Sequence, residues 1–77
     1  MEFARALGEV LREQRERRGL SQEAFGFEAE LDRTYVSGVE RGRRNPTMAI
    51  LHRWCRALGV RPSTVLRRAE DAVGWGD

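Results

Sequence analysis

Signals that end one helix and begin the next follow each other closely along this sequence, and they constrain the fold most. Gly19, Gly42 and Gly59 each close a stretch with helical spacing of apolar residues. Side chains that cap helix N-termini, or a proline suited to the first turn, open the following stretches: Ser21, Asp32, Thr47 and Pro62. No stretch alternates as a strand would. We therefore expect an all-α fold, a compact bundle of five short helices.

The expected helices cover residues 2–18, a short segment after Ser21, 33–41, the segment from Thr47 to Gly59, and Pro62 to about residue 71. Apolar stripes give the first and fourth of them a buried face: Phe3, Leu7, Val10 and Leu11 in one, and Met48, Leu51, Cys55 and Leu58 in the other. Phe25 and Ala29 should point inward from the second. Trp54 and Trp75 are interpreted as hydrophobic filler or, for Trp75, as part of a subunit interface.

A chain of 77 residues has room for one domain, expected over residues 1–71 with a short tail at 72–77. So short a domain buries only about 60% of its unfolded surface, which makes a second subunit physically useful. The composition, 40% hydrophobic and 34% charged, is that of a globular protein rather than a disordered or membrane protein. No signal peptide or apolar run of membrane-spanning length is present, so we expect a cytoplasmic protein.

The charge is unevenly distributed. All 14 basic residues are arginines, which fits phosphate and guanine recognition or, equally, a GC-rich coding bias. Residues 21–31 hold three glutamates and no arginine, whereas residues 32–56 hold six arginines against one aspartate and one glutamate. The second segment has the basic character that nucleic-acid binding requires.

Two short helices joined by a brief turn and followed by a basic loop have the outline of a helix-turn-helix, expected at about residues 21–42. At 100° per residue, Val36 and Val39 share one side of the second helix of this pair. The polar arc opposite the valines holds Arg33, Thr34, Ser37, Gly38 and Arg41. Tyr35 and Glu40 lie on the boundaries, where either could pack or contact a ligand.

The segments Ser21-Gln22-Glu23 and Leu31 to Gly42 resemble the lambda-repressor-like, Xre-type helix-turn-helix family. Within it, Arg33-Thr34-Tyr35, Glu40-Arg41-Gly42 and Arg44-Asn45-Pro46 are similar to the controller proteins of restriction-modification systems. The resemblance covers residues 3–70. It implies a homodimer that binds double-stranded operator DNA upstream of its own operon and both activates and represses.

The resemblance also implies roles for individual residues. Gln22 would meet a phosphate, Arg33 and Thr34 would meet base edges, and Tyr35 and Arg44 would also touch DNA. Glu40 would tie the recognition helix to the domain through an ion pair with Arg12 or Arg15. Together with the polar arc and the basic loop, this predicts base contacts by Arg33, Thr34 and Ser37, and backbone contacts by Gln22, Tyr35, Arg41, Arg43, Arg44 and Asn45. The dimer surface is expected on the last two helices, with His52, Val65, Val73 and Trp75.

Three positions depart from the family pattern. Glu30 stands where the turn usually has glycine, so either a residue with a side chain adopts a left-handed conformation there or the turn differs. Phe27 replaces a usually polar residue and either packs on a neighbour or is an exposed contact. Gly38 weakens its helix, but its missing side chain could let the backbone approach the DNA groove.

Other function classes have less support. A single cysteine, Cys55, and a single histidine, His52, exclude a disulfide within the chain and do not form a metal cluster, so no metal and no cofactor is expected. No set of residues for nucleophilic or acid–base catalysis can be assembled, so we do not expect an enzyme. The alternatives are a phage-type repressor or an antitoxin of the same fold, or a protein-interaction module without DNA binding. The acidic second helix could be a surface for RNA polymerase or simply a solvated face.

Overall fold

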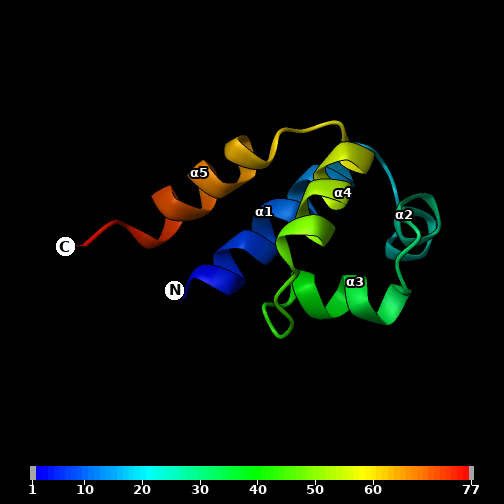
Figure 1. Ribbon diagram of the computed structural model, residues 1–77, viewed down its shortest axis with the longest axis horizontal. Coiled ribbons are helices and arrows are strands. Elements are labelled where there is room, and N and C mark those ends of the chain that lie inside the picture. Colours follow the sequence, from blue (N-terminus) through cyan, green and yellow to red (C-terminus); the bar gives the residue numbers. More distant parts are fainter. Residues whose placement is uncertain (1, 77) are drawn as a thin grey trace.

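The computed structural model describes residues 2–76. In this part of the chain it contains five α-helices and no strand, so the expected all-α fold is confirmed. Figure 1 shows their order: α1 (Phe3–Arg17), α2 (Gln22–Ala29), α3 (Arg33–Glu40), α4 (Met48–Leu58) and α5 (Pro62–Val73). Helix α5 extends two residues beyond its predicted end, and Asp77 of the predicted tail lies outside the described residues.

The predicted caps fix the helix boundaries. The Ser21 hydroxyl accepts a hydrogen bond from the Ala24 N–H at 3.0 Å, and the Thr47 hydroxyl accepts one from the Ile50 N–H at 3.1 Å. The Asp32 carboxylate accepts from the Thr34 N–H at 2.8 Å. Each bond satisfies a main-chain donor that has no partner within the helix, so each cap sets the residue at which its helix begins.

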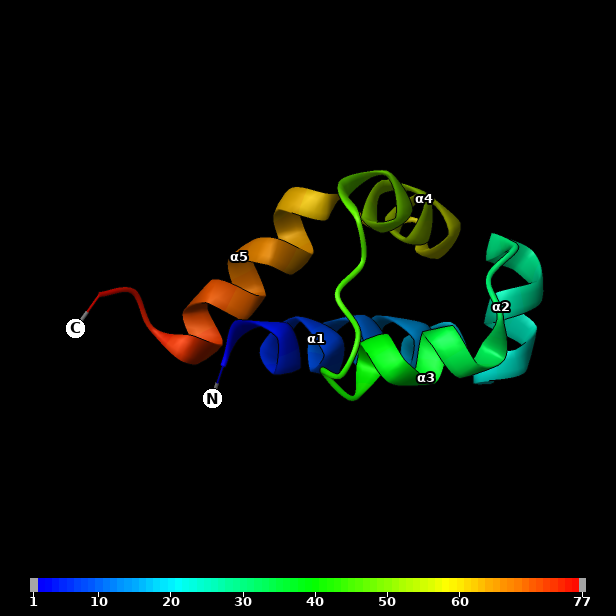
Figure 2. The same ribbon diagram turned by 60° about the horizontal axis from the view of Figure 1, so that its bottom comes forward.

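Helix α1 packs against two of the other helices. Helix α3 packs along one side of α1 and α5 along another, while α2 packs on α3 and α4. Figure 2 shows α3 and α1 running side by side, with the C-terminal end of α3 near the N-terminal half of α1. Helices α2 and α5 lie at opposite ends of the molecule. Among residues 2–76, no helix combines the length and the apolar composition needed to cross a bilayer.

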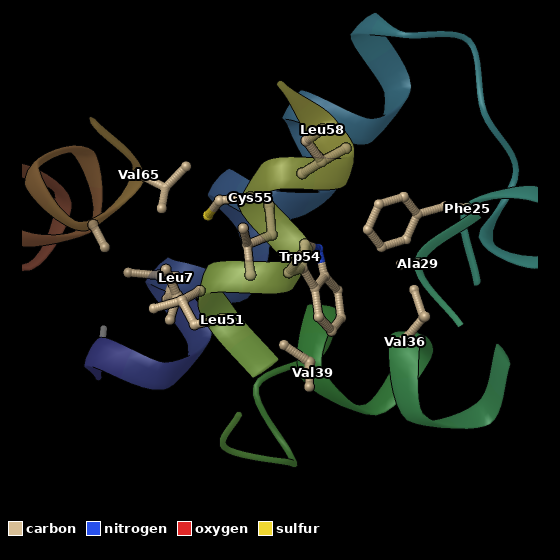
Figure 3. Packing of buried hydrophobic residues seen from close by; sticks show 13 residues of the cluster. Leu7, Phe25, Ala29, Val36, Val39, Leu51, Trp54, Cys55, Leu58 and Val65 are labelled. Atoms are coloured by element: carbon tan, nitrogen blue, oxygen red, sulfur yellow. The ribbon is translucent and has the colours of Figure 1, made fainter. Parts of the chain in front are cut away.

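Trp54 lies in the middle of the hydrophobic core. It is fully buried, and its ring centroid lies 5.4 Å from that of Phe25. Figure 3 shows Val36 and Val39 of α3 pointing toward the same region as these rings. The core therefore connects α4 to both helices of the helix-turn-helix, and it buries the face of α3 that carries the valines.

Three predictions about apolar residues are wrong. Met48 does not belong to the buried stripe of α4, because it is the first residue of that helix and 79% of it is exposed. Phe3 is 43% exposed and does not belong to the buried core. Val65, predicted for the dimer surface, is fully buried within one chain, so its side chain is not accessible to a second subunit. Trp54 provides the inward contact of α4 that Met48 does not.

Cys55 is a core residue, as predicted. Its side chain is fully buried beside α1 and α5, and burial raises the pKa of the thiol to about 11. The thiol therefore stays protonated at neutral pH, which makes it a small apolar side chain rather than a nucleophile.

Candidate nucleic-acid interface

The turn between α2 and α3 has the tight geometry of a helix-turn-helix. Glu30 adopts a left-handed conformation with φ 58° and ψ 44°, which is one of the two outcomes expected for this position. The Leu31 N–H then donates to the Gly26 carbonyl at 2.8 Å. A Cβ at Gly26 would lie 2.6 Å from the Leu31 carbonyl oxygen, so the turn can fold back onto α2 only because residue 26 is glycine.

Helix α3 presents the predicted polar arc to solvent. Arg33 and Thr34 are exposed, Ser37 is half-buried, and Val36 and Val39 on the opposite side are fully buried. Within residues 2–76, the Arg33 side chain makes neither an ion pair nor a hydrogen bond. Its guanidinium group is therefore available to a ligand at the N-terminal end of α3.

A buried polar network holds α3 against the rest of the domain. Arg15 of α1 donates from Nε to Glu40 Oε2 at 2.7 Å and from Nη2 to Glu40 Oε1 at 3.0 Å. Arg15 Nη1 also donates to the Leu20 carbonyl at 2.6 Å. The hydrogen bonds to Glu40 raise the Arg15 pKa against the opposing effect of desolvation, so the guanidinium group remains charged. Of the two partners predicted for Glu40, Arg15 is correct, and Arg12 instead pairs with Glu16 at 3.1 Å.

Gln22 is part of the same network. Its amide Nε2 donates to Glu40 Oε1 at 3.0 Å, so the first residue of α2 is tied to the last residue of α3. The sequence predicted Gln22 only as a phosphate contact, and that contact stays a prediction. The structural role was missed because it depends on a partner 18 residues away.

Arg44, in the loop after α3, is held against that helix. Its guanidinium carbon lies 5.2 Å from the centroid of the Tyr35 ring, in the range of a cation–π interaction. Its aliphatic stem crosses Gly38, where a Cβ would lie 2.5 Å from Arg44 Cγ. The missing side chain of Gly38 therefore makes room for Arg44 within the chain. The N–H groups of Arg43 and Arg44 both donate to the Gly38 carbonyl, at 2.9 and 3.2 Å, which fixes the loop.

The predicted DNA-contacting residues gather on α3, on the loop after it and at the start of α2. Arg41, Arg43, Arg44 and Asn45 are exposed, and Tyr35 is half-buried, with its ring 6.3 Å from that of Trp54. The residues predicted for the dimer surface lie apart from this group, with His52 exposed on α4, Val73 half-buried at the end of α5 and Trp75 79% exposed beyond it.

Phe27 is 87% exposed on α2, so it does not pack on a neighbour within the chain. It borders a shallow surface depression that is also lined by Glu28, Glu30 and Asp32. Glu28 lies 3.8 Å from Arg18, and both side chains are partly exposed. The acidic segment of the sequence thus becomes an acidic surface around an exposed aromatic ring, next to the turn of the helix-turn-helix.

Sequence comparison identifies relatives with named roles. Residues 11–65 match the helix-turn-helix family. Control protein C.BamHI of Bacillus amyloliquefaciens is 45% identical over 47 residues, which are 61% of this chain and 58% of that protein. The chain thus matches little more than half the length of this relative.

Solved structures share the fold over 80% of the chain or more. The restriction-modification controller protein C.AhdI of Aeromonas hydrophila is 42% identical, with a TM-score of 0.78 over 80% of this chain and 94% of its own. The clp gene regulator ClgR of Corynebacterium glutamicum is 28% identical, with a TM-score of 0.90 over 96% and 95%. The controller protein C.Esp1396I, solved as a tetramer with its natural 35 base-pair operator, is 27% identical, with a TM-score of 0.81 over 95% and 96%. The chain therefore belongs to the helix-turn-helix family, in which it is similar to restriction-modification controller proteins.

Proposed function

We propose that this chain is a sequence-specific DNA-binding transcriptional regulator of the controller type, acting as a homodimer on a pseudo-palindromic operator without a cofactor. The proposal rests on the exposed polar side chains at the N-terminal end of α3. There Arg33 and Thr34 are exposed and Arg33 has no partner in the described part of the chain. The buried Arg15–Glu40 pair holds the helix that presents them.

Base recognition is assigned to α3. An α-helix fits the major groove of B-DNA, and an arginine fork matches the O6 and N7 acceptors of guanine. Arg33 is the first residue of α3, which supports its assignment to this contact. Thr34 and Ser37 follow on the same arc, where a hydroxyl can hydrogen-bond to a base edge and the threonine methyl can contact that of thymine.

Backbone contacts are assigned to the residues around α3. Arg41, Arg43, Arg44 and Asn45 follow the recognition helix, and Gln22 and Tyr35 flank it. Phosphate contacts of this kind set position and orientation and make the affinity dependent on salt. The stacking of Arg44 on Tyr35 supports its role, since an arginine held in place loses less conformational entropy on binding.

The dimer surface is assigned to the end of the molecule that carries α5, away from α2. Phe3 is partly exposed beside Leu66, and together they line a shallow surface groove with Ser63, Arg67 and Glu70. Val73 and Trp75 continue the apolar surface toward the C-terminus, and His52 is assigned to its α4 side. Two recognition helices related by a two-fold axis would address half-sites about 34 Å apart.

Footprinting on the DNA upstream of the protein's own gene tests the function. We expect protection of a pseudo-palindromic site by the wild type and by Arg17→Ala, an exposed arginine of α1 outside the predicted interface. We expect loss of protection with Arg33→Ala at the same protein concentration. Equal protection of all DNA by all three proteins, or protection by none, would contradict the proposal.

A second regulator class is favoured by one observation, the high TM-score to ClgR, a regulator of clp genes. The same interface would then act at operators of genes unrelated to restriction and modification. Mapping the bound sites across the genome separates the two classes. Sites confined to a restriction-modification operon support a controller, and sites upstream of other genes support the second class.

The acidic surface around Phe27 is proposed as the contact for RNA polymerase in an activator. The test is transcription in vitro from a promoter next to the operator. Phe27→Ala should lower activation and leave operator affinity unchanged, since Phe27 lies outside the predicted base and backbone contacts. Unchanged activation would contradict the proposed role of Phe27 and would leave the proposal of DNA binding intact.

A further inference from the structure

A shallow pocket of about 460 Å³ lies at the C-terminal end of α3, between α1 and the segment from Glu40 to Arg43. Its lining comes from both elements: Arg5, Glu9, Arg12, Glu40, Arg41 and Arg43. Arg5, Glu9 and Arg12 are spaced four and three residues apart, so they share one face of α1. The sequence predicts no contact with DNA for Arg5, Glu9 or Arg12.

Two glycines fix the geometry of this pocket. A Cβ at Gly8 would overlap the carbonyl oxygens of Val39 and Glu40, so α1 and the end of α3 approach each other closely through Gly8. Gly42 has φ 77°, and a Cβ there would lie 2.7 Å from the Arg5 Cα atom. The loop that carries Arg41 and Arg43 therefore rests directly on the backbone of α1 at Arg5.

The pocket has an excess of positive charge. Its four arginines face two carboxylates, and the Glu40 carboxylate already accepts hydrogen bonds from Arg15 and Gln22. Glu9 lies 3.9 Å from Arg5 in an exposed pair, which is weak in water. Arg12 donates from Nε to Glu16, and within residues 2–76 its terminal nitrogens make no hydrogen bond. The same range contains no ion-pair partner for Arg41 or Arg43.

The position of the pocket relative to α3 points to one ligand. Helix α3 has 8 residues, so it is about 12 Å long, close to the width of the major groove. With Arg33 at the bases, the far end of α3 would reach the phosphates that border the groove. The arginines of the pocket gather at this far end, and planar guanidinium groups bind phosphate oxygens in pairs.

We propose that this pocket binds a phosphate group of the DNA backbone, so that Arg5 and Arg12 of α1 extend the DNA interface beyond the helix-turn-helix. The inference rests on the proposed function and deepens it. It assigns to α1 a direct part in binding, in addition to the support that Arg15 gives to α3. Each phosphate contact releases counterions and contributes about 0.9 to the slope of log affinity against log salt concentration.

The test is a salt titration of operator binding by the purified full chain, with Arg5→Ala/Arg12→Ala and the matched control Arg17→Ala. Arg17 is an exposed arginine on the same helix and does not line the pocket. The proposed dimer has two such pockets, each with one phosphate, so we expect the slope to fall by about 1.8 in the double variant, with the preference between operator and nonoperator DNA retained. A slope equal to that of Arg17→Ala would overturn the inference.

A substitution that is expected to strengthen operator binding complements the arginine variants, because a misfolded protein would not bind more tightly. Of the two carboxylates that line the pocket, Glu9 is the one that Arg15 does not bind, so Glu9→Gln should strengthen operator binding. Glu13→Gln, on the same helix but paired with Arg68 outside the pocket, is its control. Equal gains from both variants would show a general effect of net charge and would count against the pocket.

Two further outcomes separate the possible failures. If the wild type shows no preference for any operator over nonoperator DNA, the proposed function fails, whatever the slopes. If pyrophosphate at constant ionic strength raises the melting temperature of the wild type but not of Arg5→Ala/Arg12→Ala, and the slopes are equal, the pocket takes a free anion. That result would overturn its assignment to DNA.

Discussion

Arg33 has an exposed guanidinium group at the N-terminal end of α3, and its removal should affect base readout more than general affinity. One bidentate contact to guanine contributes about 1 to 3 kcal/mol of discrimination. We expect Arg33→Ala to weaken operator binding roughly tenfold to a hundredfold and to flatten the preference at one base pair in each half-site. Affinities for all single-base variants of the operator measure both effects. A uniform loss across the variants would mean that Arg33 contacts phosphate.

Arg15 matters for stability because its partner is buried. Arg15→Ala would leave the Glu40 carboxylate buried without its cation, which typically costs about 3 to 5 kcal/mol. Arg12→Ala, which breaks an exposed pair on the same helix, should cost less than about 1 kcal/mol. Urea denaturation followed by circular dichroism compares the two. Similar losses of unfolding free energy would contradict the central role of the Arg15–Glu40 pair.

The contacts of some residues could be predicted from the sequence, and those of others could not. Ser21, Asp32 and Thr47 were predicted correctly because a cap depends on main-chain groups two or three residues away. The partner of Glu40 remained open between Arg12 and Arg15, because the choice depends on how α1 is rotated about its axis against α3. Arg44 was predicted only as a DNA contact, since its packing on Gly38 follows from the path of the loop.

At the scale of elements, the order and limits of the helices follow from the sequence to within about two residues. Apolar spacing predicts less well which side chains are buried near the ends of a helix. Met48 fits the apolar spacing of α4 but precedes the part of the helix that touches the core. The sequence predicts Val65 at the contact with a second subunit, whereas in the structure Val65 of α5 packs in the core of its own chain. Such errors arise because periodicity identifies a face but not the element that covers it.

Two glycines in helix interiors should respond differently to the same substitution. Gly8→Ala would place a methyl group on main-chain oxygens at the α1–α3 contact, so we expect a loss of stability of about 1 to 3 kcal/mol. Gly38→Ala would meet only the flexible stem of Arg44 and should leave stability within about 1 kcal/mol, because alanine favours the helix. Displacing Arg44 should instead weaken operator binding. Thermal unfolding and operator titration check both variants, and equal destabilisation would contradict the geometry.

At the scale of the whole molecule, the proposed interfaces lie on different parts of the surface. DNA is assigned to α3, the loop after it, Gln22 and the arginine pocket beside α1. A second subunit is assigned to α5 with Phe3, and RNA polymerase to the surface of α2 around Phe27. This separation could not be predicted from the sequence alone, because the sequence places Phe3 on a buried face and leaves Phe27 open between packing on a neighbour and an exposed contact. Both are exposed, 43% and 87% respectively, and they lie on different helices that carry different proposed interfaces.

These two phenylalanines give a matched test of the dimer surface. Phe3→Ala should weaken self-association, because it removes apolar area from the groove beside Leu66. Phe27→Ala should leave self-association unchanged. Sedimentation equilibrium at micromolar concentration without DNA measures both variants against the wild type. A monomeric wild type, or equal effects of the two substitutions, would contradict this assignment.

We expect a symmetric dimer of this protein to read DNA sequence through α3. Selection of bound duplexes from a random-sequence pool, followed by sequencing, tests it most directly. We predict enrichment of one pseudo-palindromic sequence whose two half-sites have centres about 34 Å, or one helical turn, apart. Enrichment of a single asymmetric half-site, or of no sequence above the unselected pool, would contradict the claim.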